Sequence, residues 1–311
     1  MPGNAVATVF PGVTQTDRRA FMASLIDRLG PSCLEKGPRL EADPGYGKPT
    51  AWARGFHRSD DISKTTGATA GLEHHPDKHT CAGFGFNFAN TDLALDGLPQ
   101  SGEVEAFSLG AYARRDGRLI FVDGAIAATY ASIDSKRHFG GGTAKGDTEA
   151  TGAGIIAGIG LVLHAESFVL EPRIGLDYDY NRQDGFTERG AGAANLRISG
   201  DDHDALRCNI GMRLHTLLDL PSGAGLMPEF SAAWAHELIE PSVTLRERPV
   251  AANNSSFLVR GEKPPQEFLL IGVGLSYHPD GSDEIFVRYD GAWAKHDIHG
   301  DAISAGAKLR W

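Results

Sequence analysis

The sequence lacks any long apolar run. No segment approaches the roughly 18 to 20 consecutive apolar residues that a membrane-spanning helix needs, and the mean hydropathy of the whole chain is −0.24. The first twenty residues, "MPGNAVATVFPGVTQTDRRA", also lack a basic segment followed by an apolar core, so we expect no signal peptide here. If the protein is exported, this chain has been trimmed. A membrane β-barrel is not excluded, because only every second residue of its strands faces lipid.

Two further scarcities narrow the functional classes. Cysteine is rare, and Cys33, Cys81 and Cys208 are odd in number and widely spaced, which predicts neither a disulfide framework nor a zinc site. Basic residues are outnumbered by acidic ones, 30 against 40, for a net charge of −10. This balance argues against a general nucleic-acid binder, which needs an excess of positive charge to neutralise phosphates.

The chain does contain a two-residue alternation that returns along most of its length. In the closing "AISAGAKLRW", the residues from Ile303 to Trp311 in steps of two are apolar or small, and the residues between them include Ser304, Lys308 and Arg310. Such a pattern is typical of a β-strand with one apolar and one polar face. We find about twelve such segments: 50–59, 65–75, 79–92, 102–115, 118–131, 149–164, 167–181, 203–217, 225–239, 265–278, 283–295 and 301–311.

The links between these segments alternate between short and long. The turns "HPDK", "RRDG", "HAES", "PSGAG" and "HPDGSD" are brief, whereas the links near 132–148, 182–202 and 240–264 are much longer than ordinary hairpin loops. In a meander, all short turns fall at one end and all long links at the other. Outer-membrane barrels have this asymmetry. We therefore predict an all-β membrane protein, a twelve-stranded antiparallel up-and-down barrel.

The polar faces carry both signs of charge and many glycines, which suits a wet or helix-filled lumen and would disrupt a dry core. A soluble sandwich could expose the same face to water, so the polar face alone does not decide. Tyrosine and tryptophan lie toward strand ends, as in the aromatic belts of membrane proteins. The charged residues that we assign to the lumen are Glu73, Arg114, Asp123, Glu171, Arg173, Asp177, Asp179, Arg207, Arg213, Glu229, Arg288, Asp290, Lys308 and Arg310.

One helix is predicted ahead of the strands, in "TQTDRRAFMASLIDRLGP". Thr14 or Thr16 can cap its start, and Gly30 followed by Pro31 ends it. Two placements fit the sequence: a cap on the end of the barrel, or a helix threaded through the lumen, where its arginines would meet acidic wall residues. The helix residues with predicted roles are Arg18, Arg19, Phe21, Leu25, Asp27 and Arg28.

One helix followed by about twelve amphipathic strands and a C-terminal aromatic resembles the translocator domain of classical autotransporters (type V secretion). Local phrases are similar too, including "AWARGF", "TTGATAGLEHH", "EVEAFSLGAYARRDGRLIFVDGAIAATYA", "LEPRIGLDYDY", "RGEKPPQEFLLIGVGLSY" and "AGAKLRW". The resemblance covers roughly residues 16–311. It implies a remnant of passenger or linker in 1–15, a pore helix in 16–30, a linker in 31–49 and the translocator barrel in 50–311.

The resemblance also implies a place and partners. The barrel would lie in the outer membrane of a Gram-negative bacterium, with its C-terminus in the periplasm and its long loops outside the cell. It would export its N-terminal passenger domain, which is not present here beyond the remnant in 1–15. Its partners besides lipid would be periplasmic chaperones and the barrel assembly machinery. Leu309 and Trp311 would form the C-terminal assembly signal, although the family usually ends on Phe.

Some family members cut themselves between two asparagines inside the pore helix. Residues 14–30 contain no asparagine, so we expect no self-cleavage of that kind. We expect no enzyme activity, no cofactor and no metal: His74, His75, Asp77 and His79 in "HHPDKH" are interpreted as a solvated turn. His296, Asp297 and His299 are the one group that could form a catalytic rim site. The alternatives that remain are a standalone pore and an adhesin barrel that acts through its long extracellular loops.

Overall fold

The computed structural model describes residues 3–29, 49–95, 97–139, 142–239, 243–252, 255–261, 265–279, 283–294 and 299–310. A 3-10 helix, η1 (Ala5–Thr8), and one α-helix, α1 (Phe10–Arg28), precede the strands. The barrel strands are β1 (Thr50–Ser59), β2 (Ser63–Asp77), β3 (Thr80–Ala94), β4 (Gln100–Asp116), β5 (Ile120–Phe139), β6 (Gly142–Leu161), β8 (Val169–Gln183), β11 (Asp201–His215), β13 (Gly225–Ile239), β16 (Glu267–His278), β17 (Glu284–Ala294) and β18 (His299–Arg310).

These twelve strands form a closed antiparallel barrel in which sequence neighbours are also neighbours in space. The barrel closes where β1 pairs with β18, in the register Thr50↔Arg310 to Ser59↔Asp301. Two short strands, β7 (Leu163–His164) and β12 (Leu218–Asp219), extend the turns before β8 and β13. The predicted fold class is confirmed. Among the described residues, no helix is both long enough and apolar enough to cross a membrane.

The apolar side of each strand faces outward. Along β8, Ile174 and Leu176 are exposed while Asp177 and Asp179 are buried, and the same alternation recurs around the barrel. A soluble β-protein buries its large apolar side chains, whereas a membrane barrel presents them to lipid. The outward belt therefore excludes the sandwich interpretation.

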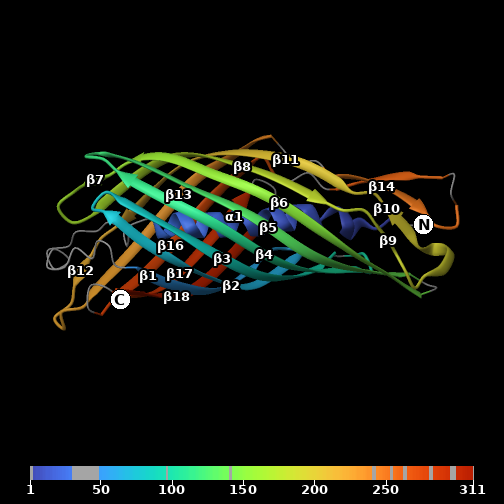
Figure 1. Ribbon diagram of the computed structural model, residues 1–311, viewed down its shortest axis with the longest axis horizontal. Coiled ribbons are helices and arrows are strands. Elements are labelled where there is room, and N and C mark those ends of the chain that lie inside the picture. Colours follow the sequence, from blue (N-terminus) through green and yellow to red (C-terminus); the bar gives the residue numbers. More distant parts are fainter. Residues whose placement is uncertain are drawn as a thin grey trace.

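The two ends of the barrel differ, as the loop lengths predict. The short turns with β7 and β12 lie at the end that also holds the C-terminal strand end, and the long links lie at the other end beside the N-terminus (Figure 1). Two long links contain a four-stranded sheet, which we call the outer sheet. Its strands are β9 (Phe186–Thr187), β10 (Leu196–Ile198), β14 (Thr244–Pro249) and β15 (Phe257–Arg260), in the order β15-β14-β10-β9. A single 3-10 turn, η3 (Gly192–Ala194), lies between β9 and β10.

The prediction of a long loop at 132–148 is wrong. β5 and β6 are each 20 residues long and stay paired through this region, for example at Asp134↔Asp147. Their inward residues Ile133 and Ala144 are buried, and Ile133 packs in the same apolar cluster as Val6 of η1. This packing stabilises the paired extension of β5 and β6, but the outward residues of the extension are polar. A search for outward apolar residues therefore ends both strands too early.

Substituting Leu176 with arginine tests the outward orientation. Leu176 is midway along β8 and 52% exposed, and an arginine facing lipid near the midplane costs about 2–4 kcal/mol. We expect Leu176→Arg to lower the free energy of unfolding by that amount in denaturant titrations in lipid vesicles. Leu258→Arg is the matched control, because Leu258 is 54% exposed in the outer sheet strand β15 and should change stability by less than about 0.5 kcal/mol. Equal effects of the two substitutions would contradict the assignment.

Candidate functional site: the lumen and its helix

The helix α1 lies inside the barrel, along the lumen (Figure 1). It begins at Phe10 rather than at residue 16, with Pro11 in its first turn, and its N-cap Val9 makes no side-chain capping bond. The predicted N-terminal caps, Thr14 and Thr16, are therefore wrong: both lie inside the helix, and the Thr14 hydroxyl lies 3.1 Å from the Pro11 carbonyl oxygen and 3.0 Å from Asn181 Oδ1 of β8. The predicted stop at Gly30 and Pro31 lies outside the described residues. Proline suits the first turn because its missing N–H needs no partner there. The buried Phe10 and Val13 explain why the helix extends further upstream.

One side of α1 is apolar and packs on one wall. Phe21, Leu25 and Leu29 share a buried cluster with Trp52 of β1 and Tyr112 of β4. Trp52 donates its indole N–H to the Tyr112 hydroxyl at 2.8 Å, which leaves the indole no unpaired polar atom in the lumen. These two aromatic residues were not predicted as lumen residues, although both lie on inward positions of their strands.

The charged residues of α1 form ion pairs with the barrel wall. Arg18 pairs with Asp179 of β8, with Arg18 Nε 3.1 Å from Asp179 Oδ2. Arg19 lies 2.7 Å from Glu237 of β13 and 3.4 Å from Asp177 of β8.

The two ends of the helix are held in the same way. At its C-terminal end, Arg28 lies 3.4 Å from Glu284 of β17, and Asp27 lies 2.9 Å from Arg213 of β11. Nearer its N-terminal end, Asp17 pairs with Arg58 of β1. Ion pairs thus connect the helix to five strands.

The sequence analysis missed three partners of the helix, Arg58, Glu237 and Glu284, and a signal was present for the two glutamates. Glu237 lies eight residues after Glu229 and Glu284 four residues before Arg288, so each shares the inward face of a residue that was assigned to the lumen. Both glutamates lie near strand ends, Glu237 two residues before the end of β13 and Glu284 at the start of β17.

The remaining predicted lumen residues pair with one another along the wall. Arg173 lies 2.6 Å from Asp123, Arg114 lies 2.5 Å from Glu171 and Arg207 lies 2.6 Å from Glu237. Arg288 pairs with Glu229 and lies 2.8 Å from Asp290, and Lys308 lies 2.6 Å from Glu73. Arg310 is half-buried and donates its backbone N–H to Asp283.

Glycines on the wall let the helix approach closely. A Cβ at Gly152 of β6 would lie 2.2 Å from Arg18 Nη1, and a Cβ at Gly154 would lie 2.5 Å from Met22 Cε. Both glycines face inward, so the space that a side chain would fill is taken by α1. The glycine-rich polar face is thereby explained: it shapes a lumen that is filled by the helix rather than by its own side chains.

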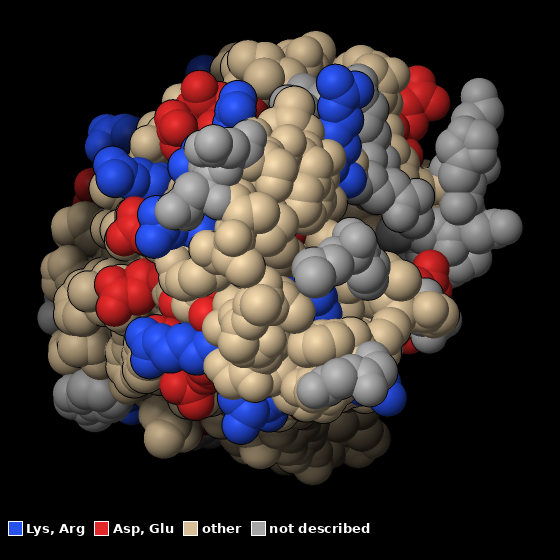
Figure 2. All heavy atoms as spheres, turned by 90° about the vertical axis from the view of Figure 1, so that its right-hand side faces the viewer, with Lys and Arg blue, Asp and Glu red and all other residues tan. Residues whose placement is uncertain are grey.

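At the long-link end, η1 is buried under the outer sheet. The Asn4 backbone N–H donates to both carboxylate oxygens of Glu247 at 3.1 and 2.9 Å, and Asn4 Nδ2 donates to Glu188 at 3.0 Å. Burial raises the pKa of Glu247, and the Asn4 N–H acts in the opposite direction. Seen from this end, described side chains fill the centre of the molecule, with charges of both signs around them (Figure 2).

Several predicted positions lie outside the described residues, and others differ in whether their side chains are exposed. Trp311, His296 and Asp297 lie outside them, and Leu309 is exposed on the outer surface of β18. Of the "HHPDKH" turn, His74, Asp77 and His79 are exposed as predicted, but His75 is buried. What the arrangement provides is a lined passage with one helix seated in it.

The family of the chain follows from a comparison with family models. The model described as "Autotransporter beta-domain" matches residues 44–290. The chain belongs to the autotransporter β-domain family. It is therefore an outer-membrane translocator barrel by family, and the resemblance found in the sequence is confirmed.

Solved structures of this family share the fold. The translocator domain of the autotransporter NalP from Neisseria meningitidis matches with a TM-score of 0.75 and 18% identity, covering 99% of both chains. The β-domain of the Bordetella autotransporter BrkA has a TM-score of 0.62 and 16% identity, over 84% of this chain and 99% of that one. The transport unit of AIDA-I from Escherichia coli has a TM-score of 0.52 and 12% identity, over 94% and 98%. A comparison with curated proteins gives no match.

Proposed function

We propose that this autotransporter β-domain exports an N-terminal passenger to the cell surface and anchors it in the outer membrane. The observation that carries the proposal is the threading of the lumen. The chain enters the barrel at the long-link end through η1, and α1 ends near the short-turn end, where β1 starts. A polypeptide that continues upstream of η1 would leave the barrel at the long-link end.

This proposal fixes the orientation of the barrel. The long links and the outer sheet face the cell exterior, and the short turns and the C-terminal end of β18 face the periplasm, as is general for outer-membrane barrels. Leu309, exposed at the end of β18, and Trp311 would present the signal for the barrel assembly machinery, after delivery by periplasmic chaperones. The domain acts as a conduit and anchor and carries out no reaction of its own.

No passenger release by asparagine chemistry is expected within the helix. Phe10–Arg28 contains no asparagine, and Asn4 lies upstream in the N-cap of η1. We therefore propose that a passenger stays covalently attached unless another agent cleaves it.

A surface-display experiment tests the proposal. An epitope-tagged reporter with a secretion signal is fused ahead of residue 1, and protease is added to intact cells. We expect the reporter to be removed while the barrel keeps the heat-dependent gel mobility of a folded outer-membrane protein. The matched control is the same fusion without β17 and β18, which cannot close the barrel and should leave the reporter protected. A protected reporter in cells that contain the folded barrel would contradict export.

The adhesin alternative makes a different prediction in the same cells. Deleting residues 182–202 and 240–264 removes all four strands of the outer sheet. Under the export proposal the reporter stays on the surface after this deletion. If the barrel is an adhesin, the deletion abolishes binding of the cells to their target, whether or not the reporter is displayed.

A further inference from the structure

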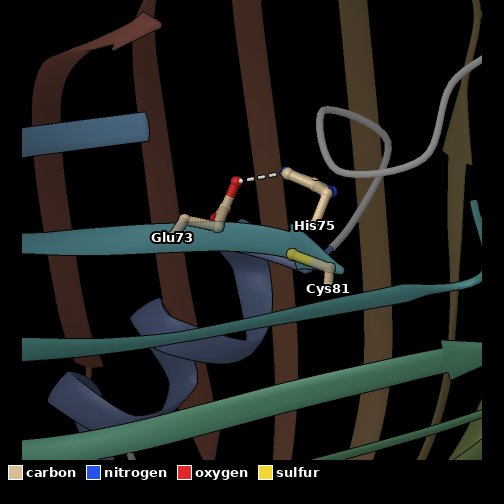
Figure 3. A group of neighbouring side chains, drawn as sticks. All are labelled: Glu73, His75 and Cys81. Atoms are coloured by element: carbon tan, nitrogen blue, oxygen red, sulfur yellow. Dashed lines mark hydrogen bonds and ion pairs between the residues drawn. The ribbon is translucent and has the colours of Figure 1, made fainter. Parts of the chain in front are cut away.

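A second cluster of chemically competent side chains lies at the short-turn end of the lumen, where Cys81 shares a buried apolar cluster with Leu25 and Leu29 of the helix end. Glu73 and His75 of β2 and Cys81 of β3 offer one carboxylate oxygen, one imidazole nitrogen and one thiol sulfur that all lie within 4.8 Å of one another. All three side chains are buried. Figure 3 shows them converging at the end of the hairpin, with the Glu73 carboxylate turned toward the His75 ring.

A β-bulge brings these residues together. The register of β2 and β3 passes from His74↔Ala82 to Asp77↔Thr80, so His75 and Pro76 oppose Cys81 alone. Two residues opposite one is the definition of a bulge, and bulges re-aim side chains at the rims of barrels. Pro76 is tolerated at this place because it has no N–H to give to the ladder.

We propose that Glu73, His75 and Cys81 form a Zn²⁺ site that pins the β2–β3 hairpin. Thiolate, imidazole and carboxylate are the three ligand types that Zn²⁺ takes from proteins, and three protein ligands leave a fourth position for water. Bonds of about 2.0–2.3 Å to one tetrahedral ion place ligand atoms roughly 3.3–3.8 Å apart. Because the present separations are 4.8 Å or less, they need to shorten by up to about 1.5 Å, which adjustments of the side-chain rotamers supply.

The surroundings of Glu73 explain how the carboxylate is held. Lys308 Nζ lies 2.6 Å and His75 Nε2 lies 3.2 Å from Glu73 Oε1, and the Tyr112 hydroxyl donates to Glu73 Oε2 at 3.2 Å. Partners outside the ligand set orient metal ligands in this way. A bound Zn²⁺ would displace the Lys308 ammonium from this oxygen and take its place as the positive charge beside the carboxylate.

The other polar side chains of the turn belong to a different environment. His74 and His79 are exposed, and Asp77 accepts the His79 backbone N–H at 2.7 Å and the Thr80 hydroxyl at 3.1 Å. These residues offer a separate, solvated set of ligands. Substituting them therefore distinguishes metal binding at the buried site from weak binding at the surface.

Cobalt titration of the full chain, folded in detergent with its thiols kept reduced, tests the proposal. Co²⁺ replaces Zn²⁺ and gives a thiolate-to-metal charge-transfer absorption when a cysteine ligates it. We expect this band in the native sequence, its displacement by Zn²⁺ and its loss in Cys81→Ser. We expect His75→Ala and Glu73→Gln to weaken Co²⁺ binding by at least about tenfold. Cys208→Ser, Cys33→Ser and the pair His74→Ala with His79→Ala are the matched controls and should keep the band and the affinity.

Zinc K-edge absorption of the native protein covers the case in which a variant fails to fold. One sulfur at about 2.3 Å with two or three nitrogen or oxygen atoms at about 2.0–2.2 Å is the expected shell. No charge-transfer band at saturating Co²⁺, a band that persists in Cys81→Ser, a band abolished by removing His74 and His79, or a zinc shell without sulfur would each overturn the proposal.

Discussion

Deleting residues 1–30 raises the steady conductance of the barrel in planar bilayers on the order of tenfold, if α1 is what fills the lumen. The buried residues of the helix occupy the passage from Phe10 to Arg28, and nothing else among the described residues runs along it. A barrel of this size without a plug holds a water-filled channel. The native chain is therefore expected to conduct weakly and the deletion variant strongly.

The control for this deletion keeps α1 intact and weakens the contacts ahead of η1 at the long-link end. Asn4→Ala removes the side-chain bond to Glu188 but leaves α1 in place, and should leave conductance close to the native value. A native chain that already conducts like the deletion variant would support the standalone pore instead. A deletion variant that stays closed would show that other segments seal the barrel.

Removing Arg18 is expected to loosen the helix strongly. Arg18 and Asp179 are both fully buried and paired, and Arg18→Ala leaves the carboxylate without its partner. Breaking one side of a buried pair costs about 3–5 kcal/mol, because the remaining charge stays desolvated. Hydrogen exchange of α1 amides should then accelerate on the order of 10²- to 10³-fold, since each 1.4 kcal/mol is a factor of ten.

The matched control is an arginine in an exposed pair. Arg182 lies 3.6 Å from Asp184, and both side chains are more than half exposed, so Arg182→Ala should change helix exchange by less than about fivefold. The double variant Arg18→Ala with Asp179→Asn should recover part of the loss, because the uncompensated charge is gone. Equal exchange in Arg18→Ala and Arg182→Ala would show that the ion pair does not seat the helix.

The fold was predictable because the alternation of apolar and polar residues repeats in twelve segments. A one-residue error in any strand would exchange its lipid and lumen faces, so the pattern determines which residues are inside. Ile174, Leu176 and Asp177 show this: their order in the sequence alone places the first two outward and the third inward.

The details at the ends were less predictable. The extension of β5 to Phe139 depends on packing against Val6 and Phe10, which are far away in the sequence. The start of α1 at Phe10 depends on the same cluster rather than on a capping side chain, so no local signal marks it.

The sequence predicted that charged residues line the lumen, but it did not predict which of them pair with the helix. Inward charges follow from strand parity, yet the choice of Glu237 for Arg19 and Glu284 for Arg28 depends on how far the helix descends and how it is rotated in the lumen. The grouping of His75 with Cys81 depends on a bulge, which shifts the register by one residue and has no signature beyond Pro76.

Quenching of tryptophan fluorescence by lipids with brominated acyl chains tests the central claim most directly, namely that the apolar faces meet lipid and the ionic faces enclose the lumen. Two variants are compared in vesicles, each with a single tryptophan: Trp234, which is 42% exposed on the outside of β13, and Trp52, which is 2% exposed in the lumen. The account predicts strong quenching of Trp234 and little quenching of Trp52. Quenching of Trp52 with Trp234 unaffected, or a protein that stays monomeric and folded in buffer without detergent, would contradict it.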